Sequence, residues 1–236
     1  MSIKGKAYIA GIFEHPTRKA VDLSVAQLHA EVAAGALAEA AGRANLSLEV
    51  INTADPATIA AADRIVLPGV GHYADCAANL RARPGLVAAL ESAVVDHKIP
   101  FLGICVGMQL MAKRGLEHVI SEGLGWIDGE VRLIEPAPAP DGRALKVPHM
   151  GWNRVRQTQQ HPMWHNIEDM ERFYFVHSYF VQPDDSSEIM GESEYPEPFC
   201  AALGHKNIFA VQFHPEKSQH NGLQLLNNFL SWDGQA

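Results

Sequence analysis

Cys105 lies in the stretch Phe101-Leu-Gly-Ile-Cys-Val-Gly-Met-Gln-Leu-Met111, where Gly103 and Gly107 flank it in the pattern G-x-C-x-G. The stretch predicts a short apolar strand, a sharp turn and a helix start, the nucleophile elbow built with a thiol. Glycines suit such a turn because a Cβ would clash with the nearby backbone. The N–H groups of the helix start can lower a thiol's pKa and bind an oxyanion. The alternative is a buried cysteine that only packs.

A cysteine nucleophile needs a base, and the base needs an acceptor that orients it. In Val211-Gln-Phe-His-Pro-Glu-Lys-Ser218, His214 and Glu216 are two residues apart at the end of an expected strand and project to one side. The carboxylate can fix the tautomer of the imidazole and favour the imidazolium, which favours the thiolate of Cys105. With twelve histidines in the chain, a surface His-Glu pair without function is the alternative. The indication comes from the pair and the elbow together.

The elements that must position these residues change in type along the chain. In the first half we expect strands at Lys6–Ile12, Leu46–Ile51, Arg64–Leu67 and Ile99–Ile104, and helices at Asp22–Ala44, Pro84–His97 and Val106–Arg114. In the second half we expect strands at Gly129–Ile134, Leu145–Val147, Arg172–Val181, Glu188–Ser193, Ala201–Gly204 and Ile208–Phe213, and a closing helix at Gly222–Leu230. The alternation predicts parallel βαβ units. We therefore expect one α/β domain over residues 1–236, in three layers, with a mixed, mainly parallel central sheet flanked by helices and antiparallel strands in the second half.

Composition is ordinary for a globular protein, with 236 residues, 47% hydrophobic and 19% charged. The formal net charge of −8 argues against a nucleic-acid partner. No apolar run is long enough for a membrane span, and the opening residues lack a signal peptide. The three cysteines are too few and scattered for a disulfide framework, so we expect a reducing, cytoplasmic setting. The spacing of His149, His161, His165 and His205 shows no repeating ligand pattern, so we expect no metal. We expect no cofactor either.

From about Leu46 to Trp232 the chain resembles the class I (triad) glutamine amidotransferases, and among them the glutaminase subunit of imidazole glycerol phosphate synthase. The segments that carry the resemblance are Leu67-Pro-Gly-Val-Gly71, Phe101–Leu110, Gly123-Leu-Gly-Trp126, Lys146-Val-Pro-His-Met-Gly-Trp-Asn153, Val176-His-Ser-Tyr179 and Gln212-Phe-His-Pro-Glu-Lys-Ser218. The fourth and fifth point to this subunit rather than to the guanylate, carbamoyl-phosphate or anthranilate relatives. The resemblance implies a class I glutamine amidotransferase-like fold.

The resemblance also implies a reaction. Cys105 would attack the side-chain amide of glutamine, form a glutamyl thioester and release ammonia. His214 would move the protons, and Glu216 would orient it. Backbone N–H groups of Val106 and of the turn Gly69-Val70-Gly71 would hold the oxyanion. In this subunit the turn would reorient when the partner's substrate binds.

Further residues would hold the substrate and the partner. The resemblance places glutamine against Gln109 and the Val176–Tyr179 strand, which contains His177, Ser178 and Tyr179. It implies a heterodimer with a cyclase, a (β/α)₈ barrel that takes the ammonia and makes imidazole glycerol phosphate in histidine biosynthesis. Trp152 and Lys217, with Tyr179, would lie toward that interface. The alternatives are a packed tryptophan, a solvated lysine and, for His177, a histidine satisfied by its neighbours.

The first 45 residues differ from this family. The family opens with a strand that runs into a Tyr-Gly-x-Gly-Asn-Leu turn, whereas this chain has Phe13-Glu-His-Pro-Thr-Arg-Lys19. Residues Ile3–Ala41 resemble instead the opening of a thiolase-family acyltransferase, as at a junction of two genes. The rest of a thiolase is absent, so we expect no thiolase activity. We expect Lys6–Ile12 to keep the first-strand position, and docking to the cyclase to be impaired because the missing turn faces that partner.

Three hypotheses for the function follow. The first is an enzyme subunit that hydrolyses glutamine and delivers ammonia for histidine biosynthesis. The second is a chimeric, poorly coupled or catalytically silent relative that acts only as an interaction subunit. The third is a different triad amidotransferase, which its acceptor partner would distinguish.

Overall fold

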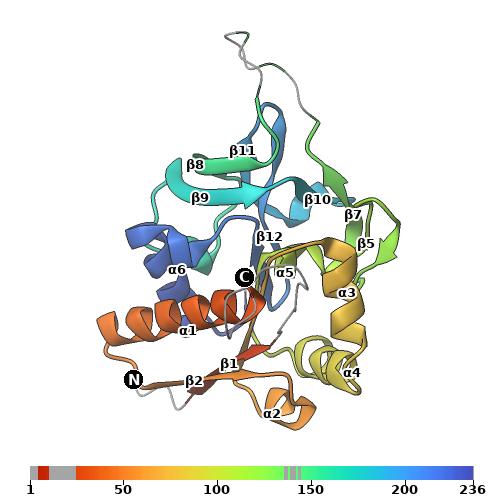
Figure 1. The fold of residues 1–236 in the computed structure, drawn as a ribbon. Helices are drawn as coiled ribbons and strands as arrows, with labels where there is room; N and C mark the ends of the chain where they lie inside the picture. Colours follow the sequence, from red (N-terminus) through yellow and green to blue (C-terminus); the bar gives the residue numbers. More distant parts are fainter. Residues whose placement is uncertain (1–4, 11–24, 136–137, 139–141, 143–144, 236) are drawn as a thin grey trace.

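The computed structural model describes residues 5–10, 25–135, 138, 142 and 145–235 (Figure 1). The helices are α1 (Val25–Arg43), α2 (Pro56–Ala60), α3 (Tyr73–Arg81), α4 (Leu86–Glu91), α5 (Val106–Gln109) and α6 (Gln219–Ser231), with short helical turns η1 (Ser92–Asp96), η2 (Pro162–Trp164), η3 (Ser186–Glu188) and η4 (Pro215–Lys217). The strands are β1 (Gly5–Ala10), β2 (Leu48–Thr53), β3 (Arg64–Gly69), β4 (Phe101–Cys105), β5 (Ala112–Gly115), β6 (Ser121–Glu122), β7 (Ile127–Leu133), β8 (His149–Gln157), β9 (Glu171–His177), β10 (Tyr179–Pro183), β11 (Ile189–Glu194), β12 (Pro198–His205) and β13 (Ile208–Val211).

The central sheet has the order β2-β1-β3-β4-β13-β12-β11-β8-β9. Pairing is parallel from β2 to β13 and antiparallel from β13 to β9. The expected mixed sheet, with antiparallel strands from the second half of the chain, is confirmed, and its antiparallel part is as long as its parallel part. Strand β1 pairs with β2 and β3, so the opening segment takes the first-strand position as expected.

Helices cover the parallel part of the sheet on both sides (Figure 1). The alanine-rich α1 lies beside α6 on one side of the central strands, and α3 and α4 lie on the other. Helix α1 buries Ala33, Leu37 and Ala40, which recur at helical spacing and face the core. The strands β3, β4 and β13 between the layers are almost wholly buried. The apolar runs of these strands follow from their position, because a parallel strand is covered on both faces.

The segment after the elbow differs from the prediction. The helix expected over Val106–Arg114 ends at Gln109, and Ala112–Gly115 forms β5. Backbone pairing explains the difference, because β5 pairs with β7 and the N–H groups of Trp126 and Ile127 donate to Met111 O. These strands belong to a second sheet of order β10-β7-β5-β6. Long-range hydrogen bonds thus override the local helical pattern.

Two other expected strands change. Residues Leu145–Val147 form no strand, and pairing with β9 begins only at His149. The expected strand Arg172–Val181 breaks at Ser178, after which β9 stays in the central sheet and β10 joins the second sheet. Helix α3 was not predicted. The turn at Phe13–Lys19 lies outside the described residues.

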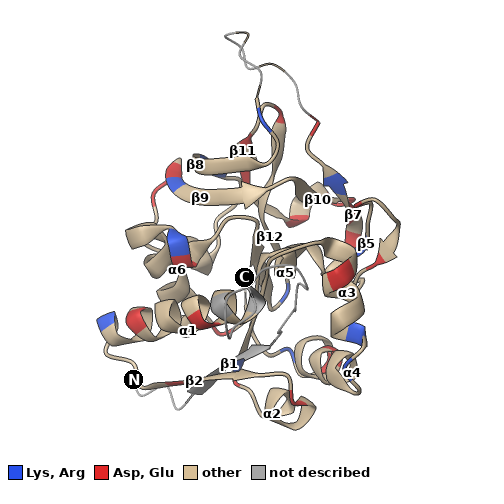
Figure 2. Ribbon diagram, in the orientation of Figure 1, with Lys and Arg blue, Asp and Glu red and all other residues tan. Residues whose placement is uncertain are grey.

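Charged side chains of both signs are spread over the outer elements, including α1, α3, α4 and the second sheet (Figure 2). The central strands β4 and β13 carry none. Among the described helices, none combines the length and the apolarity that crossing a membrane requires. Because β4 and β13 carry no charge, a fully buried carboxylate close to their ends is unusual, and Glu216 provides one.

Candidate functional site

The carboxyl ends of three neighbouring parallel strands meet at one edge of the sheet. Gly69 ends β3 directly opposite Cys105, which ends β4, and His214 follows β13 on the other side of β4. Open α/β sheets bind ligands beside the carboxyl ends of their strands. The topology therefore brings together residues that are far apart in the sequence.

Cys105 has the geometry of a nucleophile elbow. Its φ of 54° and ψ of −113° lie where residues with a side chain are strained. The turn is tight, because a Cβ on Gly107 would lie 1.7 Å from Leu67 O of β3. A Cβ on Gly69 would lie 2.8 Å from Gly107 N. The close contact between β3 and the elbow thus requires glycine at positions 69 and 107.

A cavity of about 270 Å³ opens over Cys105. This volume lies just below the range of roughly 300–1,000 Å³ that is typical of drug-sized ligands. The lining residues are Val70, Gly71, Cys105, Val106, Gln109, Glu117, Pro148, Val176, His177, Ser178, Tyr179 and His214. The predicted residues for binding glutamine and most of those for the oxyanion therefore line one cavity. Val176 belongs to the strand predicted to hold glutamine, and the structure adds Glu117 and Pro148 to the lining.

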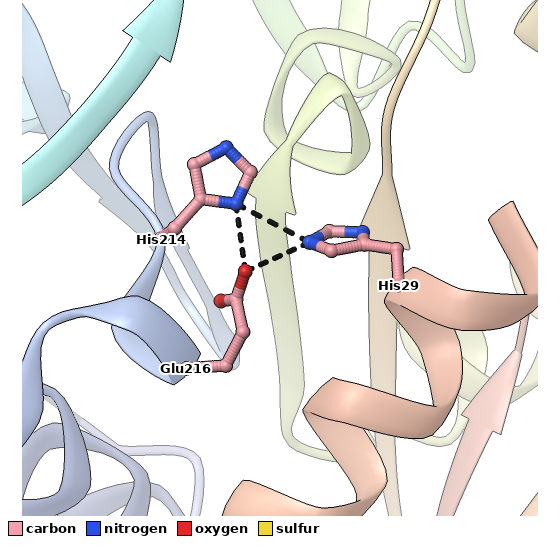
Figure 3. A group of neighbouring side chains, drawn as sticks. All are labelled: His29, His214 and Glu216. Carbon is pink, nitrogen blue, oxygen red and sulfur yellow. Dashed lines mark hydrogen bonds and ion pairs between the residues drawn. The ribbon is translucent and has the colours of Figure 1, made fainter. Parts of the chain in front are cut away.

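His214 and Glu216 form the expected pair (Figure 3). Nδ1 of His214 lies 2.7 Å from Oε1 of Glu216, and both side chains are fully buried. An ionised carboxylate only accepts, so Nδ1 carries the proton and Nε2 keeps its lone pair. In the part of the chain that is described, Nε2 has no hydrogen-bond partner. It therefore makes no hydrogen bond to Cys105 either. The imidazole is therefore in the form of a general base and faces the same cavity as the thiol.

Burial decides the resting charges. It raises the pKa of Cys105 to about 12, and the carboxylate of Glu216 adds to this rise. Burial likewise lowers the pKa of His214, although the hydrogen bond to Glu216 opposes the shift. The expected imidazolium and thiolate are thus not the resting pair. At neutral pH the site holds a thiol, a neutral imidazole and a carboxylate, and the thiolate forms only as its proton leaves.

A chain of amides joins the cavity wall to the thiol. Nε2 of Gln109 donates to Tyr179 O at 2.9 Å and to Oε1 of Gln212 at 3.0 Å. Nε2 of Gln212 donates to Sγ of Cys105 at 3.6 Å. Both N–H groups of Gln109 are used, so its Oε1 is what remains for a ligand. Gln212 is fully buried and was not predicted as a site residue, although it belongs to the Gln-Phe-His-Pro-Glu segment.

His177 supports the opposite wall. Its Nδ1 donates to Tyr179 O at 2.9 Å, and its Nε2 accepts from Nδ1 of His149 at 3.0 Å. Nε2 of His149 in turn accepts from the amide of Asn153 at 3.3 Å. Burial lowers the pKa of His177 to about 3 and that of His149 to about 4, so both rings are neutral. His177 therefore holds β9, β10 and β8 in register at the cavity.

Because His177 is buried and neutral, the folded chain should lose stability in acid. The pKa of His177 is about 3 in the folded chain and about 6.5 in an unfolded one. Below pH ~6.5 the unfolded chain therefore takes up a proton that the folded chain refuses, and the free energy of unfolding falls by up to about 1.4 kcal/mol per pH unit. We expect His177→Asn, whose Nδ2 can still donate to Tyr179 O, to show a shallower loss between pH 6.5 and 5 in urea unfolding.

The control is His165→Asn, since this histidine is exposed, and its slope should match that of the parent chain. Equal slopes for all three proteins would contradict the assignment of a buried, neutral His177.

Of the residues predicted for a partner, Trp152 and Lys217 lie outside the cavity, whereas Tyr179 lines it. Trp152 on β8 is 45% exposed and packs edge-to-face on Tyr174 at 6.0 Å between ring centres. Met150 of the same strand is 62% exposed, and Lys217 in η4 is exposed as well. Exposed Met and Trp side chains on one strand are typical of protein–protein contact surfaces.

A fourth polar residue, His29 of α1, was not predicted as part of the site. Its Nε2 lies 2.8 Å from Oε1 of Glu216 and 3.2 Å from Nδ1 of His214 (Figure 3). The side chain is 5% exposed. Its place four residues before Ala33 and eight before Leu37 sets it on the buried face of α1, which was the signal that could have found it.

Comparison with protein families matches residues 33–232 to the model described as "Glutamine amidotransferase class-I". "Imidazole glycerol phosphate synthase subunit HisH" of Brucella abortus (strain 2308) is 47% identical over 200 residues, which cover 84% of this chain and 91% of the relative. The protein of the same description from Neisseria meningitidis serogroup B is 47% identical over 190 residues, covering 80% and 88%. That of Mesorhizobium japonicum is 46% identical over 200 residues, covering 84% and 91%.

Solved structures share the fold. A putative GMP synthase protein from Thermoplasma acidophilum superposes with a TM-score of 0.58 at 18% identity, over 96% of this chain and 92% of that one. A glutamine amidotransferase from Thermotoga maritima gives 0.56 at 17% identity, over 89% and 75%. The expected amidotransferase-like architecture is thereby confirmed.

Proposed function

This chain belongs to the class-I glutamine amidotransferases, and within them to the HisH subunits of imidazole glycerol phosphate synthase, and we propose that it releases ammonia from glutamine at Cys105. The observation that carries this proposal is the strained elbow of Cys105, which lines the same cavity as His214. Among the described residues, Nε2 of this histidine has no hydrogen-bond partner. The ammonia serves histidine biosynthesis.

The first half-reaction makes a thioester. His214 Nε2 takes the proton of the thiol while the sulfur attacks the amide carbon of glutamine. The oxyanion is held by the N–H of Val106 and by the turn Gly69–Gly71. When this intermediate collapses, His214 returns the proton to the amide nitrogen, ammonia leaves, and glutamate stays bound to sulfur as a thioester. Removing one oxyanion donor typically costs about 100- to 1,000-fold in rate.

The second half-reaction restores the enzyme. His214 takes a proton from water, whose oxygen attacks the thioester carbon. Collapse breaks the carbon–sulfur bond, and the proton returns to sulfur as glutamate leaves. Glu216 accepts the N–H of Nδ1 throughout, so it stabilises the imidazolium of both half-reactions. Because both thiol and imidazole rest neutral, proton transfer at the moment of attack supplies the charge separation.

Substrate binding is assigned to the cavity wall. Gln109 offers its Oε1, and Ser178 and Tyr179 lie where β9 passes into β10. His177 lines the cavity too, but its two nitrogens are both used by Tyr179 O and His149, so its part is to hold this wall rigid. Glutamine would then lie with its amide over Cys105.

The partner is proposed to be a cyclase that forms a heterodimer with this chain in the cytoplasm and receives the ammonia directly. The exposed face of β8, with Trp152, and the exposed Lys217 next to Glu216 are the proposed contact surface. Strand β8 connects to the site, since its Asn153 bonds to His149 and thus to His177.

Trp152→Ala tests this surface. We expect the affinity for the cyclase to fall about 30-fold, as for an aromatic residue at the centre of an interface, and cyclase-stimulated glutaminase activity to fall with it. Glutaminase activity without the cyclase should stay unchanged. Titration calorimetry and an ammonia assay measure the two. Ile120→Ala is the control, because this residue is 74% exposed at a loop outside the proposed surface. Equal affinities for parent and Trp152→Ala would remove β8 from the interface.

Labelling with a chloroketone analogue of glutamine tests the enzyme proposal. The sulfur of Cys105 should displace chloride, so that the peptide that holds it gains the mass of the analogue less that of HCl, as found by mass spectrometry. Cys76 and Cys200 are buried and do not line the cavity, so they should stay unlabelled. A chain that binds the cyclase but takes no label at Cys105, with or without the partner, would be the catalytically silent relative instead.

A further inference from the structure

We propose that His29 is a positioning residue of this site, which holds the carboxylate of Glu216 and keeps His214 in the tautomer whose Nε2 is free. The inference rests on the proposed function. It concerns a residue that precedes the segment 33–232 matched by the family model and lies in the opening that resembles another protein class.

The protonation of the group follows from its distances. Oε1 of Glu216 lies 2.8 Å from Nε2 of His29 and 2.7 Å from Nδ1 of His214. An ionised carboxylate has no proton to give, so each nitrogen must be a donor to it. The separation of 3.2 Å between the two nitrogens is then not a hydrogen bond between the rings. It is the convergence of two N–H groups on one oxygen.

Ionisation of Glu216 is consistent with this reading. Burial alone would raise its pKa, but the N–H groups of His214 and His29 hold the pKa well below its usual range. The second oxygen, Oε2, has no partner among the described residues. Both bonds therefore fall on Oε1, and they set the rotation of the carboxylate about its last torsion.

The tautomer matters because the two rings could pair in another way. If Nε2–H of His29 donated to a bare Nδ1 of His214, the proton of His214 would lie on Nε2. His214 could not then take the proton of Cys105. A charged acceptor binds N–H about twice as strongly as a neutral one, so Glu216 draws both protons and keeps Nε2 of His214 bare. Once His29 is lost, a single N–H orients the carboxylate.

The packing of α1 holds His29 in a fixed position. The residue lies on the buried face of α1, with Ala30 and Ala33 fully or almost fully buried beside it. Helix α1 packs beside α6, and η4, which carries Glu216, leads directly into α6. The carboxylate is thus fixed between two elements that are distant in the sequence. A side chain held in this way can orient a base without touching the substrate.

Substitution of His29 gives the test. His29→Leu removes the donor at similar size, and His29→Gln keeps an N–H near the position of Nε2. We expect His29→Leu to lower kcat of glutamine hydrolysis about tenfold with KM unchanged, and His29→Gln to recover most of kcat. Leu37→Ala is the control, since it loosens the same helix face without touching Glu216. It should lower the unfolding midpoint but leave kcat of the folded fraction unchanged.

A second readout needs no turnover. In protein labelled with ¹⁵N-histidine, the nitrogen shifts show which ring nitrogen carries hydrogen, and His214→Gln assigns the signals. We expect His214 to carry hydrogen on Nδ1 in the parent chain and in His29→Gln, and partly on Nε2 in His29→Leu. A parent chain with hydrogen on Nε2, or an unchanged kcat and tautomer in His29→Leu, would overturn the proposal. If the tautomers follow this expectation in a chain that releases no ammonia, the proposed function fails and the assignment of His29 stands.

Discussion

Replacing Cys105 by alanine should abolish the release of ammonia from glutamine while the fold persists. The sulfur atom supplies the bond to the substrate, and no other nucleophile lines the cavity in a strained turn among the described residues. In enzymes that use a triad, loss of the nucleophile costs on the order of 10⁶ in kcat. We therefore expect at least a 10⁴-fold loss in a coupled assay for glutamate. Alanine fits the same space, so the thermal midpoint should change little.

The matched controls are Cys76→Ala and Cys200→Ala. Both thiols are buried, as Cys105 is, but they hydrogen-bond to backbone carbonyls, Cys76 to Val70 O and Cys200 to Ala202 O. Their removal should keep kcat within about twofold of the parent chain. If Cys105→Ala retained activity within tenfold, or if Cys76→Ala lost as much, the nucleophile would have to be assigned elsewhere.

Gly107→Ala should be the most destabilising single-methyl substitution at the elbow. The new Cβ would lie 1.7 Å from Leu67 O and 2.8 Å from its carbonyl carbon, and both atoms belong to the rigid backbone of β3. Neither β3 nor the elbow can yield without breaking the parallel pairing of β3 and β4. We expect a loss of about 3 kcal/mol or more in the free energy of unfolding, measured by urea titration.

Gly35→Ala makes the same chemical change in a helix, where an added Cβ meets nothing within 4 Å. Here alanine should stabilise the chain by about 0.5–1 kcal/mol, because it restricts the unfolded backbone and favours helix. The pair of variants therefore has effects of opposite sign. A stable, active Gly107→Ala would show that the turn is not closed against β3.

Loss of Gly107 should also separate stability from chemistry. Any folded fraction of Gly107→Ala must shift the elbow away from β3, so Cys105 would leave the position opposite Gly69. We expect the folded fraction, isolated by size exclusion, to react slowly with the chloroketone analogue. Cys105 in Gly35→Ala should react as in the parent chain.

The amino-acid sequence by itself determined the types of chemistry. The strand, glycine and cysteine at Phe101–Gly107 specify an elbow because only that turn needs small residues on both sides of a nucleophile. The segment Gln212–Ser218 specifies a histidine and a carboxylate at fixed spacing, and their contact of 2.7 Å follows from that local spacing. The parallel half of the sheet likewise follows from the alternation of apolar runs and helices, a pattern of period and length.

The tertiary structure alone decided what depends on distant partners. Helix α5 ends at Gln109 because the residues that follow it form β5, which pairs with β7. The expected strand Arg172–Val181 divides at Ser178 because its two parts pair with different strands. The resting charges of Cys105 and His214 come from burial, which no local motif encodes. Above all, His29 reaches Glu216 across 187 positions of sequence. Local patterns can place a polar residue on the buried face of a helix, but only the packing of α1 against η4 determines which group it meets.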